Sequence, residues 1–177
     1  HSPNCTKALD YGGGSGDFSN YLLNKNISSI NYDPNCNNAL SSIDAYPSKK
    51  NFDIISFWHS IEHIHNIEDV FNNIDSLLKK DGILLIAIPN HEAYERKYFF
   101  HNQWIAYDPP RHLYHFNFQT FKSLLGKYNF TIEKTYPMYQ DTFFNILMSS
   151  MSKNPFKFIY RSIRSVFAIF RDKNFSS

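Results

Sequence analysis

The sequence predicts an α/β fold in which a mostly parallel sheet is covered by helices on both faces. Segments with strand composition alternate along the chain with segments that have apolar residues at helical spacing. The strand segments are near-continuous apolar runs, which are typical of parallel strands buried on both faces. With 177 residues, the chain is long enough to build a core of its own.

The first expected unit is a strand, a glycine-rich turn and a helix. Residues 8–11 close a short apolar strand that leads into the glycine-rich run 12–16, and helical composition continues to Leu23. We expect Ser15 or Asp17 to cap this helix, because either side chain offers an oxygen to the free N–H groups of the first turn.

Six further elements complete the pattern. The apolar runs at 52–59 and 83–88 have the length of buried strands. The helix between them has five apolar residues at helical spacing, and Lys79, Lys80 and Gly82 are typical of a helix C-terminus. In chain order, the elements are a strand over 28–32, a strand over 52–59, a helix over 68–80, a strand over 83–88, a helix over 118–128 and a strand over 131–135.

The composition excludes several classes of protein. Hydrophobic residues make up 42% of the chain and charged residues 19%, which is unlike a disordered protein. The longest apolar run, 83–88, is too short to span a membrane, and no secretory signal pattern opens the chain. Cys5 and Cys36 provide neither a disulfide framework nor a metal-binding spacing, which predicts a reducing, cytoplasmic location.

Positive charge is concentrated toward the end of the chain. Residues 153–177 contain six of the 18 Lys and Arg residues but only one of the 16 acidic residues. The remainder is faintly acidic, so it lacks the broad basic face of a nucleic-acid-binding protein. We expect a single domain over 1–177, with a cofactor-binding body over 1–152 and a basic amphipathic helix over 153–177.

The glycine turn after the first strand indicates a nucleotide cofactor. Glycines let the backbone approach a ligand closely, and the following helix presents free N–H groups at its N-terminus. The dinucleotide pattern G-x-G-x-x-G is absent, because Asp17 and Ser19 stand where its two registers require the third glycine. A nicotinamide-dependent reductase is therefore the less favoured alternative.

The segment LDYGGGSG at 9–16 resembles the first motif of the class I S-adenosylmethionine-dependent methyltransferases. The resemblance covers about residues 7–136. It is closest to bacterial members of the family that carry LWH-x-LEH and RHLYHF segments. It implies a Rossmann-like seven-stranded sheet with strand order 3-2-1-4-5-7-6 and S-adenosylmethionine as cofactor. Few residues separate Asp33 from Asp44, and the tail after Ser152 ends without a clear final strand. We therefore expect the third strand and the last strand to be incomplete in this chain. The other matching segments are FDII at 52–55, WHSIEHI at 58–64, LLKKDGIL at 77–84 and RHLYHF at 111–116.

By this resemblance, the cofactor contacts come from the glycine motif and from residues after later strands. Asp33 matches the carboxylate that accepts hydrogen bonds from both ribose hydroxyls. Asp44 stands where the family places an acidic residue against the adenine amino group. The implied cofactor-binding residues are Asp10, Tyr11, Gly12, Gly13, Gly14, Gly16, Asp33, Asp44 and His59.

His59, Glu62 and His63 are spaced at i, i+3 and i+4, so a helical segment would present them on one face. An E-x-x-E-H turn helps to hold a divalent ion in small-RNA 2′-O-methyltransferases and in ubiquinone-pathway O-methyltransferases, but His59 replaces the first Glu here. One interpretation is a metal site suited to Zn, Fe or Mn. The favoured interpretation is that these side chains line the pocket without a metal.

Four histidines, His59, His63, His112 and His115, are candidate catalytic residues, because imidazole titrates near neutral pH and can act as a general base. The aromatic segment 99–114 stands where the family commonly contacts its methyl acceptor, and its rings suit a flat or apolar substrate. We therefore expect methyl transfer to a small-molecule or lipid-like acceptor, at oxygen. A non-catalytic methyltransferase-like binding module is the alternative.

The tail segment 154–171 alternates aromatic residues with cations. Packing of its apolar stripe onto the body is the favoured interpretation. The alternative is peripheral contact with an anionic membrane, which would suit a lipid-like acceptor. The stripe consists of Phe156, Tyr160, Ile163, Phe167 and Phe170.

Overall fold

The computed structural model describes residues 5–37, 39, 40, 42 and 51–150, and in the tail 156, 159, 160, 163, 164 and 167. The chain divides into two compact units, His1–Ile88 and Pro89–Ser177. The expectation of a single domain over 1–177 stays a prediction.

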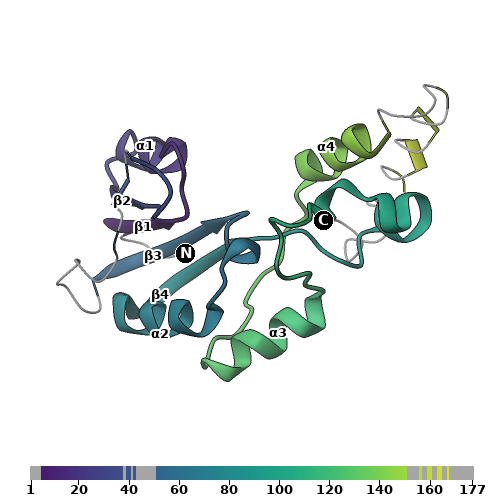
Figure 1. Ribbon diagram of the computed structural model, residues 1–177. Helices are drawn as coiled ribbons and strands as arrows, with labels where there is room; N and C mark the ends of the chain where they lie inside the picture. The colour runs from purple at the N-terminus through teal and green to yellow at the C-terminus, as the bar shows by residue number, and fades with distance from the viewer. Residues whose placement is uncertain are drawn as a thin grey trace. The chain divides into compact units, whose positions relative to one another are not determined.

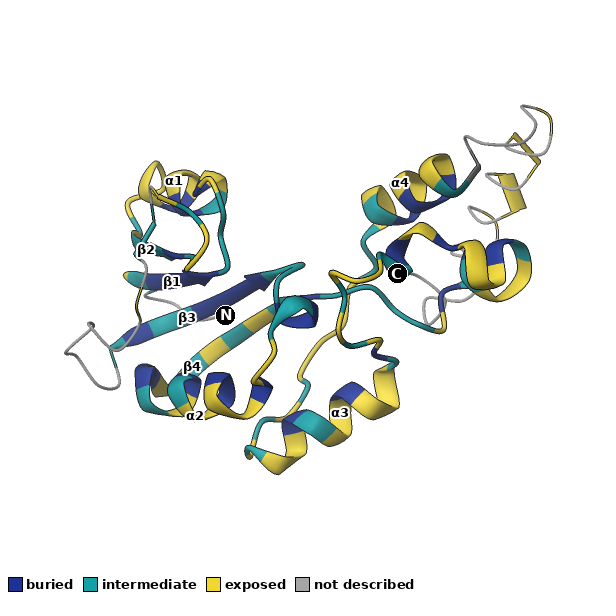
Figure 2. Cartoon of the chain, viewed as in Figure 1, coloured by how far each residue is buried: buried dark blue, intermediate teal, exposed yellow. Residues whose placement is uncertain are grey.

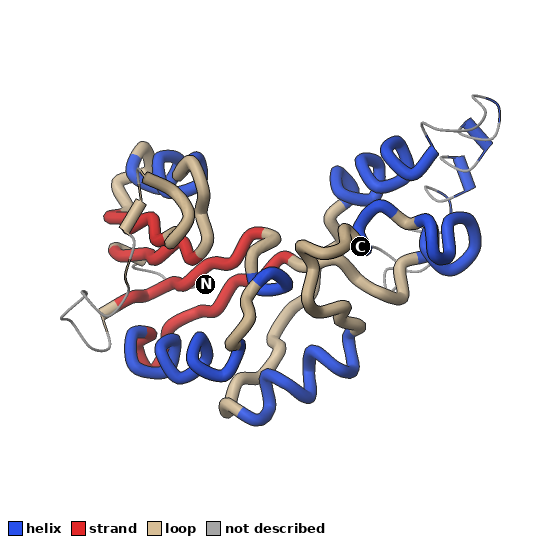
Figure 3. The backbone as a smooth tube through the Cα atoms, in the orientation of Figure 1, coloured by secondary structure: helices blue, strands red, loops and turns tan. Residues whose placement is uncertain are grey.

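The first unit contains a four-stranded sheet with strand order β2-β1-β3-β4, in which every pairing is parallel (Figure 1). This order reproduces the central 2-1-4-5 part of the expected arrangement, so the α/β class is confirmed. Seven strands are not present among the described residues. The strands are β1 (Lys7–Tyr11), β2 (Ser28–Tyr32), β3 (Phe52–Trp58) and β4 (Leu78–Ala87), drawn in red in Figure 3.

Helix α1 (Asp17–Leu23) follows the glycine turn, but its cap differs from the expectation. Gly16 occupies the N-cap position with a φ of 85°, and no side chain caps the helix. Asp17 is the first helical residue, and its carboxylate accepts a hydrogen bond from Ser15 Oγ at 2.9 Å. The prediction of Ser15 or Asp17 as cap was wrong because the turn needs a left-handed residue immediately before the helix.

Helix α2 (Ile67–Leu77) ends earlier than expected, and β4 begins at once with Leu78. Asn66 caps this helix by accepting a hydrogen bond from the Asp69 N–H. Lys79, Lys80 and Gly82 therefore belong to a strand, although they have the composition of a helix end. Pairing of Leu78 with Phe52 of β3 fixes an extended backbone there, and this long-range contact outweighs the local signal.

The core of the first unit lies between the sheet and its helices. Leu9 and Ile55 of the central strands are fully buried, as is Phe71 of α2. β2 has one additional neighbour, because Leu40 forms an isolated parallel bridge with Tyr32. Among the described residues, this bridge is all that represents the expected third strand. On β4, Ile83 and Leu85 are exposed, as the yellow bands along that strand show in Figure 2.

The second unit is built from short helical turns and two longer helices. α3 (Phe118–Lys127) begins with a reciprocal cap: Asn117 and Thr120 each accept the other's backbone N–H, at 2.8 and 3.0 Å. A small core contains Ala93, Phe100, Trp104, Ala106 and Ile146, the last of which comes from α4 (Tyr139–Ser150). The short turns are η2 (Arg96–Phe100), η3 (His101–Gln103) and η4 (Ile105–Tyr107), and η1 (Ile61–His63) is their counterpart in the first unit.

The strand expected over 131–135 is absent, which corrects that prediction. The segment is not helical, but it pairs with no strand in the described part of the chain, and four of its five residues are exposed. A strand needs a neighbour to satisfy its backbone groups, and sequence composition does not supply one.

The described tail residues are helical, and each of them is exposed. Phe156, Tyr160, Ile163 and Phe167 of the expected stripe are 51–81% exposed, so the structure does not show them packed, contrary to the favoured interpretation. Phe170 lies outside the described residues. No helix in the described part of the chain is long and apolar enough to cross a bilayer.

Candidate functional site

The glycine loop at the end of β1 is held against the end of β2. The Gly12 N–H donates to the Tyr32 carbonyl at 2.7 Å, and the Gly16 N–H donates to the Gly13 carbonyl at 2.9 Å. Gly12, Gly14 and Gly16 have φ values of 74°, 53° and 85°. Side chains are strained in this left-handed region, so the loop geometry itself requires glycine at these positions.

Two polar side chains lie beneath this loop. Asp10 of β1 is buried, and its Oδ1 accepts a hydrogen bond from Ser56 Oγ of β3 at 2.9 Å. Asn31 of β2 stands opposite Asp10 in the strand register, and its Nδ2 donates to the Gly14 carbonyl at 2.9 Å. Burial raises the pKa of the Asp10 carboxyl, and the hydrogen bond from Ser56 opposes this rise.

Each of these two side chains keeps one buried oxygen without a hydrogen-bond partner among the described residues, namely Asp10 Oδ2 and Asn31 Oδ1. Both oxygens lie so close to Gly13 that a Cβ atom on this residue would collide with them. A buried acceptor without a hydrogen bond is costly, so these two oxygens are expected to bind a group that donates hydrogen bonds. An ammonium group provides three donors and a positive charge, so these acceptors fit the amino group of an amino-acid moiety such as that of S-adenosylmethionine.

Asp33 lies immediately after β2, beside the same loop. Its Oδ2 accepts from the Gly14 N–H at 3.0 Å, and its Oδ1 accepts from the Asn35 N–H at 2.8 Å. The carboxylate therefore shapes the loop in this structure, and its contact with a ribose stays a prediction. Asp44 lies outside the described residues.

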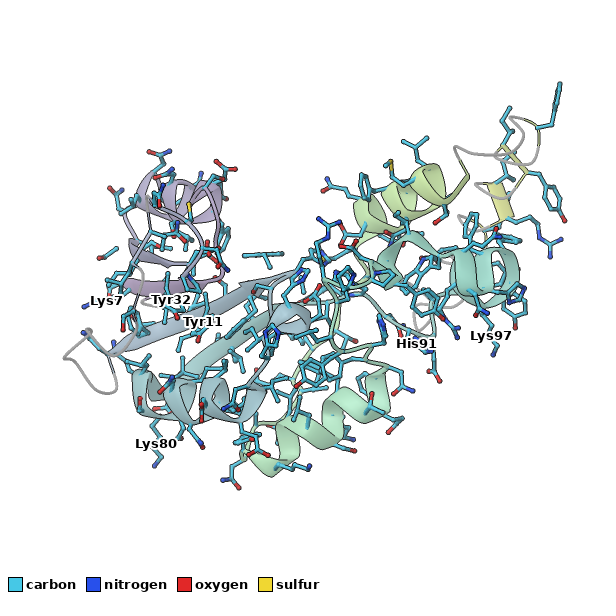
Figure 4. All side chains as sticks on the ribbon, in the orientation of Figure 1. Lys7, Tyr11, Tyr32, Lys80, His91 and Lys97 are labelled. Atoms are coloured by element: carbon cyan, nitrogen blue, oxygen red, sulfur yellow. The ribbon has the colours of Figure 1, made fainter. Side chains whose placement is uncertain are left out.

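The Tyr11 side chain belongs to the core of the first unit. Its ring centroid lies 4.6 Å from that of Tyr32 and 4.7 Å from that of Phe57. Figure 4 labels Tyr11 and Tyr32. Tyr11 is only 8% exposed, so its backbone is the part that faces the glycine loop. The Ser60 hydroxyl donates to the Tyr11 carbonyl at 2.8 Å and joins this loop to the segment after β3.

The segment after β3 places the first group of histidines. His59 has a φ of 50°, and its N–H donates to the Ala87 carbonyl of β4. Its Nδ1 lies 3.5 Å from Oε1 of the buried Glu62, within ion-pair distance. Residues 61–63 form a 3-10 turn rather than an α-helix, and His59 lies before this turn with a left-handed backbone, so the three side chains do not share one helical face. Ligand atoms of Glu62 and His63 lie within 4.8 Å of each other. The geometry supports a His59–Glu62 pair, and a three-residue metal site that includes His63 stays a prediction.

The second unit places the remaining histidines around Tyr107. His115 and His91 both contact the Tyr107 ring, with centroid distances of 5.1 and 5.7 Å. Burial lowers the pKa of both imidazoles; nearby His112 contributes for His115, and Arg96 and His115 contribute for His91. Both side chains are therefore neutral near pH 7, which leaves an imidazole nitrogen able to accept a proton.

His112 has a different environment. Its Nδ1 lies 2.7 Å from the Ala106 carbonyl, and its Nε2 lies 3.9 Å from Asp108 Oδ2. With one nitrogen hydrogen-bonded to the backbone and the other facing a carboxylate, this ring is suited to hold the loop around Asp108 in place. His115 is the better placed of the two for chemistry.

A surface pocket of about 550 Å³ lies in the second unit, beside His115. Most of its wall comes from the aromatic segment 99–114, as expected for an acceptor site. Trp104, Ile105 and Tyr107 supply apolar surface, while Asp108 and His115 supply polar atoms. An apolar wall with a few polar groups is the usual composition of a small-molecule site.

The sequence analysis did not identify several residues that build these sites. Asn31 and Ser56 position the groups beneath the glycine loop, and His91 and Arg96 surround Tyr107, where Arg96 Nη1 donates to the Tyr107 hydroxyl at 3.1 Å. Asn31 and Ser56 stand near the carboxyl ends of their strands, which is the signal that marks ligand-facing positions in parallel sheets. No comparable pattern in the sequence distinguishes His91 or Arg96.

Comparison with known proteins gives a consistent result. The family model described as a methyltransferase domain matches residues 4–135. A SAM-dependent methyltransferase from Archaeoglobus fulgidus is 25% identical, aligned over 72% of this chain and 62% of that chain, with a TM-score of 0.57. No curated protein matches the chain.

Two more distant structures share the fold. A SAM-dependent methyltransferase from Thermotoga maritima is 18% identical over 73% of this chain and 65% of that chain, with a TM-score of 0.53. Phosphoethanolamine N-methyltransferase 2 of Haemonchus contortus, in complex with S-adenosyl-L-methionine, is 16% identical over 98% of this chain and 47% of that chain, with a TM-score of 0.58. The chain thus spans less than two thirds of the length of these structures.

Proposed function

The chain belongs to the methyltransferase domain family, and from this membership we propose that it is an S-adenosylmethionine-dependent methyltransferase that acts on a small-molecule acceptor. The observation that carries the proposal is the pair of buried oxygens, Asp10 Oδ2 and Asn31 Oδ1, beside Gly13. They provide a negative, acceptor-rich site at the carboxyl end of parallel strands, where ligands of such sheets bind.

In this proposal the glycine loop and its two supporting side chains hold the amino-acid end of the cofactor. Asp33 would release or share its loop contacts to accept from the ribose hydroxyls, and Asp44 would face the adenine. Bound S-adenosylmethionine supplies a methyl group on a positively charged sulfur, which is already activated for transfer. The protein's task is then to position the acceptor and to remove its proton.

We propose the pocket beside Tyr107 as the acceptor site and an acceptor oxygen as the atom methylated. The neutral imidazole of His115 lines this pocket and is the candidate base. The activated methyl group would come from bound S-adenosylmethionine, and the chain's own part would be to hold the acceptor hydroxyl and take up its proton. The acceptor's proton passes to His115. An apolar pocket wall also suits a lipid-like acceptor, and for such an acceptor peripheral membrane contact would ease access.

Three other predictions rank below this one. A divalent metal at His59, Glu62 and His63 ranks lower because His59 lies outside the 3-10 turn that holds the other two. A nicotinamide-dependent reductase is less favoured because this chain lacks the G-x-G-x-x-G pattern. A non-catalytic binding module is less favoured because it would give no role to the neutral histidines around Tyr107.

The cytoplasmic location and the bacterial origin stay predictions.

Calorimetric titration with S-adenosylmethionine and S-adenosylhomocysteine tests the proposal. We expect micromolar binding of both, lost in Asp33→Ala, and no binding of NADH or NADPH. Circular dichroism of the variant confirms that it is folded. If the folded wild-type chain binds neither sulfur compound, the proposed cofactor is wrong, and binding of a nicotinamide cofactor instead would favour the reductase.

A further inference from the structure

Helix α4 buries polar residues and exposes apolar ones, which is the reverse of an ordinary surface helix. Its buried face includes Thr142 and Asn145 beside Ile146. The helix also has an exposed face, drawn in yellow in Figure 2, and this face is largely apolar. It consists of Tyr139, Phe143, Phe144, Leu147 and Met148, which are 40–57% exposed. A surface helix normally turns its apolar stripe inward, so an outward apolar face of this size marks an interaction surface.

The described residues of the tail also include large apolar side chains that are exposed to solvent. Phe156, Ile159, Tyr160, Ile163 and Phe167 are helical, and the spacing of 156, 160, 163 and 167 by three or four residues is that of one helix face. Each of them is 51–81% exposed. Two consecutive helical segments therefore present large apolar side chains to solvent.

The charge of this region is almost entirely positive. Between residues 139 and 171 the sequence contains five cations and a single acidic residue, Asp141. In the sequence, Lys157 and Arg161 alternate with these apolar residues. Arg164 lies over the ring of Tyr160, 5.9 Å from its centroid. Large apolar residues flanked by cations are typical of helices that lie in the interface of an anionic membrane.

We propose that the exposed apolar residues of α4 and of the described tail form a lipid-docking surface that binds an anionic bilayer, to which the basic sequence around these residues attracts it. The apolar side chains would enter the headgroup region while the cations pair with lipid phosphates. Charge favours this occupant over a second copy of the chain, since a symmetric contact would bring like charges together. The proposal does not depend on methyl transfer.

Vesicle flotation of the full chain tests this surface. We expect the protein to float with vesicles of phosphatidylcholine and phosphatidylglycerol, but not with phosphatidylcholine alone, and to be released by high salt. The double variant Lys157→Gln/Arg161→Gln should weaken binding roughly tenfold or more, because each cation near an anionic surface contributes separately. Lys122→Gln/Lys127→Gln on α3 removes the same charge from another exposed helix and should have little effect.

The apolar half of the surface is tested by Phe144→Gln on α4, which should reduce flotation while circular dichroism and S-adenosylmethionine titration stay unchanged. Absence of flotation by the wild-type chain would overturn the proposal, as would equal binding to neutral vesicles. If Phe144→Gln instead abolishes a concentration-dependent dimer in light scattering, the face is a protein interface and the lipid proposal is wrong. Titration with S-adenosylmethionine on the same samples tests the proposed function separately.

Discussion

Asp10 and Asn31 stand opposite each other on β1 and β2, and each directs one buried oxygen to the same point beside Gly13. Neither oxygen has a hydrogen-bond partner among the described residues. A folded protein retains such a pair at a cost in stability, because two buried acceptors close together repel each other and have lost their water. The arrangement is therefore expected to serve a ligand rather than the fold.

Replacing Asp10 by Asn should separate stability from binding. The amide oxygen can still accept from Ser56, while the desolvated carboxylate is removed. We expect the free energy of unfolding at pH 7 to rise by about 1 kcal/mol, and the Kd for S-adenosylmethionine to rise at least about tenfold through loss of a charge-assisted contact. Urea unfolding and calorimetry measure the two effects.

The sign of the stability effect depends on pH. Because burial raises the pKa of Asp10 in the folded state, protonation favours folding, and the wild type loses stability as pH rises through that pKa. The advantage of Asp10→Asn should consequently be present at pH 7 and shrink in acid, where wild-type Asp10 is already neutral. If Asp10→Asn binds S-adenosylmethionine as tightly as the wild type, Asp10 does not contribute to the cofactor site.

Gly13→Ala should be strongly destabilising although Gly13 does not have a positive φ. A Cβ atom there would collide with Asp10 Oδ2 and Asn31 Oδ1, which are held by their other hydrogen bonds. We expect a loss of about 2 kcal/mol or more in urea unfolding, as for an overpacked site, together with loss of cofactor binding. Gly126→Ala in α3 is the matched control, since nothing lies within 4 Å of its Cβ position, and it should stabilise the protein by about 0.5–1 kcal/mol. Equal effects of the two changes would contradict the crowded geometry at Gly13.

The elements that could be predicted from the sequence are those whose local composition agrees with the contacts they make with distant parts of the chain. The apolar strands and the glycine turn were found because burial on both faces and left-handed backbone leave a direct mark on composition. The end of α2 was misplaced because Lys79, Lys80 and Gly82 look like a helix terminus, while the pairing of Leu78 and Ile83 with β3 on either side of them is a contact distant in sequence. The strand over 131–135 failed for the same reason, since β composition does not guarantee a partner.

The candidate site shows a similar division. Asp10, Asp33 and the glycines follow a fixed local spacing, so a resemblance can locate them. Asn31 and Ser56 act through register between neighbouring strands, which no local pattern encodes. The neutral state of His91 and His115 arises from burial and from charges brought together by folding, so it cannot be predicted from their positions in the sequence.

Asp53 should make the first unit sensitive to acid. Its Oδ1 accepts from Lys79 Nζ at 2.5 Å, and its Oδ2 accepts from the N–H groups of Thr6 and Lys7 at 3.0 Å. The hydrogen bond from Lys79, followed by those from the start of β1, lowers the pKa of Asp53 to about 2. This stabilisation is complete above the ordinary carboxyl pKa of about 4 and is lost as pH falls toward 2.

We expect Asp53→Asn to reduce the free energy of unfolding at pH 7 by about 1–2 kcal/mol, a value limited by the partial exposure of Lys79. The difference from the wild type should vanish between about pH 4 and pH 2 in urea unfolding experiments. Asp81→Asn changes an exposed carboxylate on β4 and should alter neither value appreciably. A pH-independent difference for Asp53→Asn would show that charge does not carry the effect.

The histidines around Tyr107 provide a test of the proposed base. Both His91 and His115 should titrate below the ordinary value of 6.5 in NMR spectra of the imidazole groups, assigned with His91→Gln and His115→Gln. Arg96 lowers the pKa of His91 by charge repulsion, while Glu92 opposes it. Arg96→Gln should therefore raise the pKa of His91 and leave that of His115 nearly unchanged. Because a lowered histidine pKa stabilises the fold above the unfolded pKa, both histidines should also weaken the fold as pH falls below the ordinary value of 6.5. If His115 titrates at or above 6.5, it is substantially protonated near neutral pH and is poorly suited to accept the acceptor's proton.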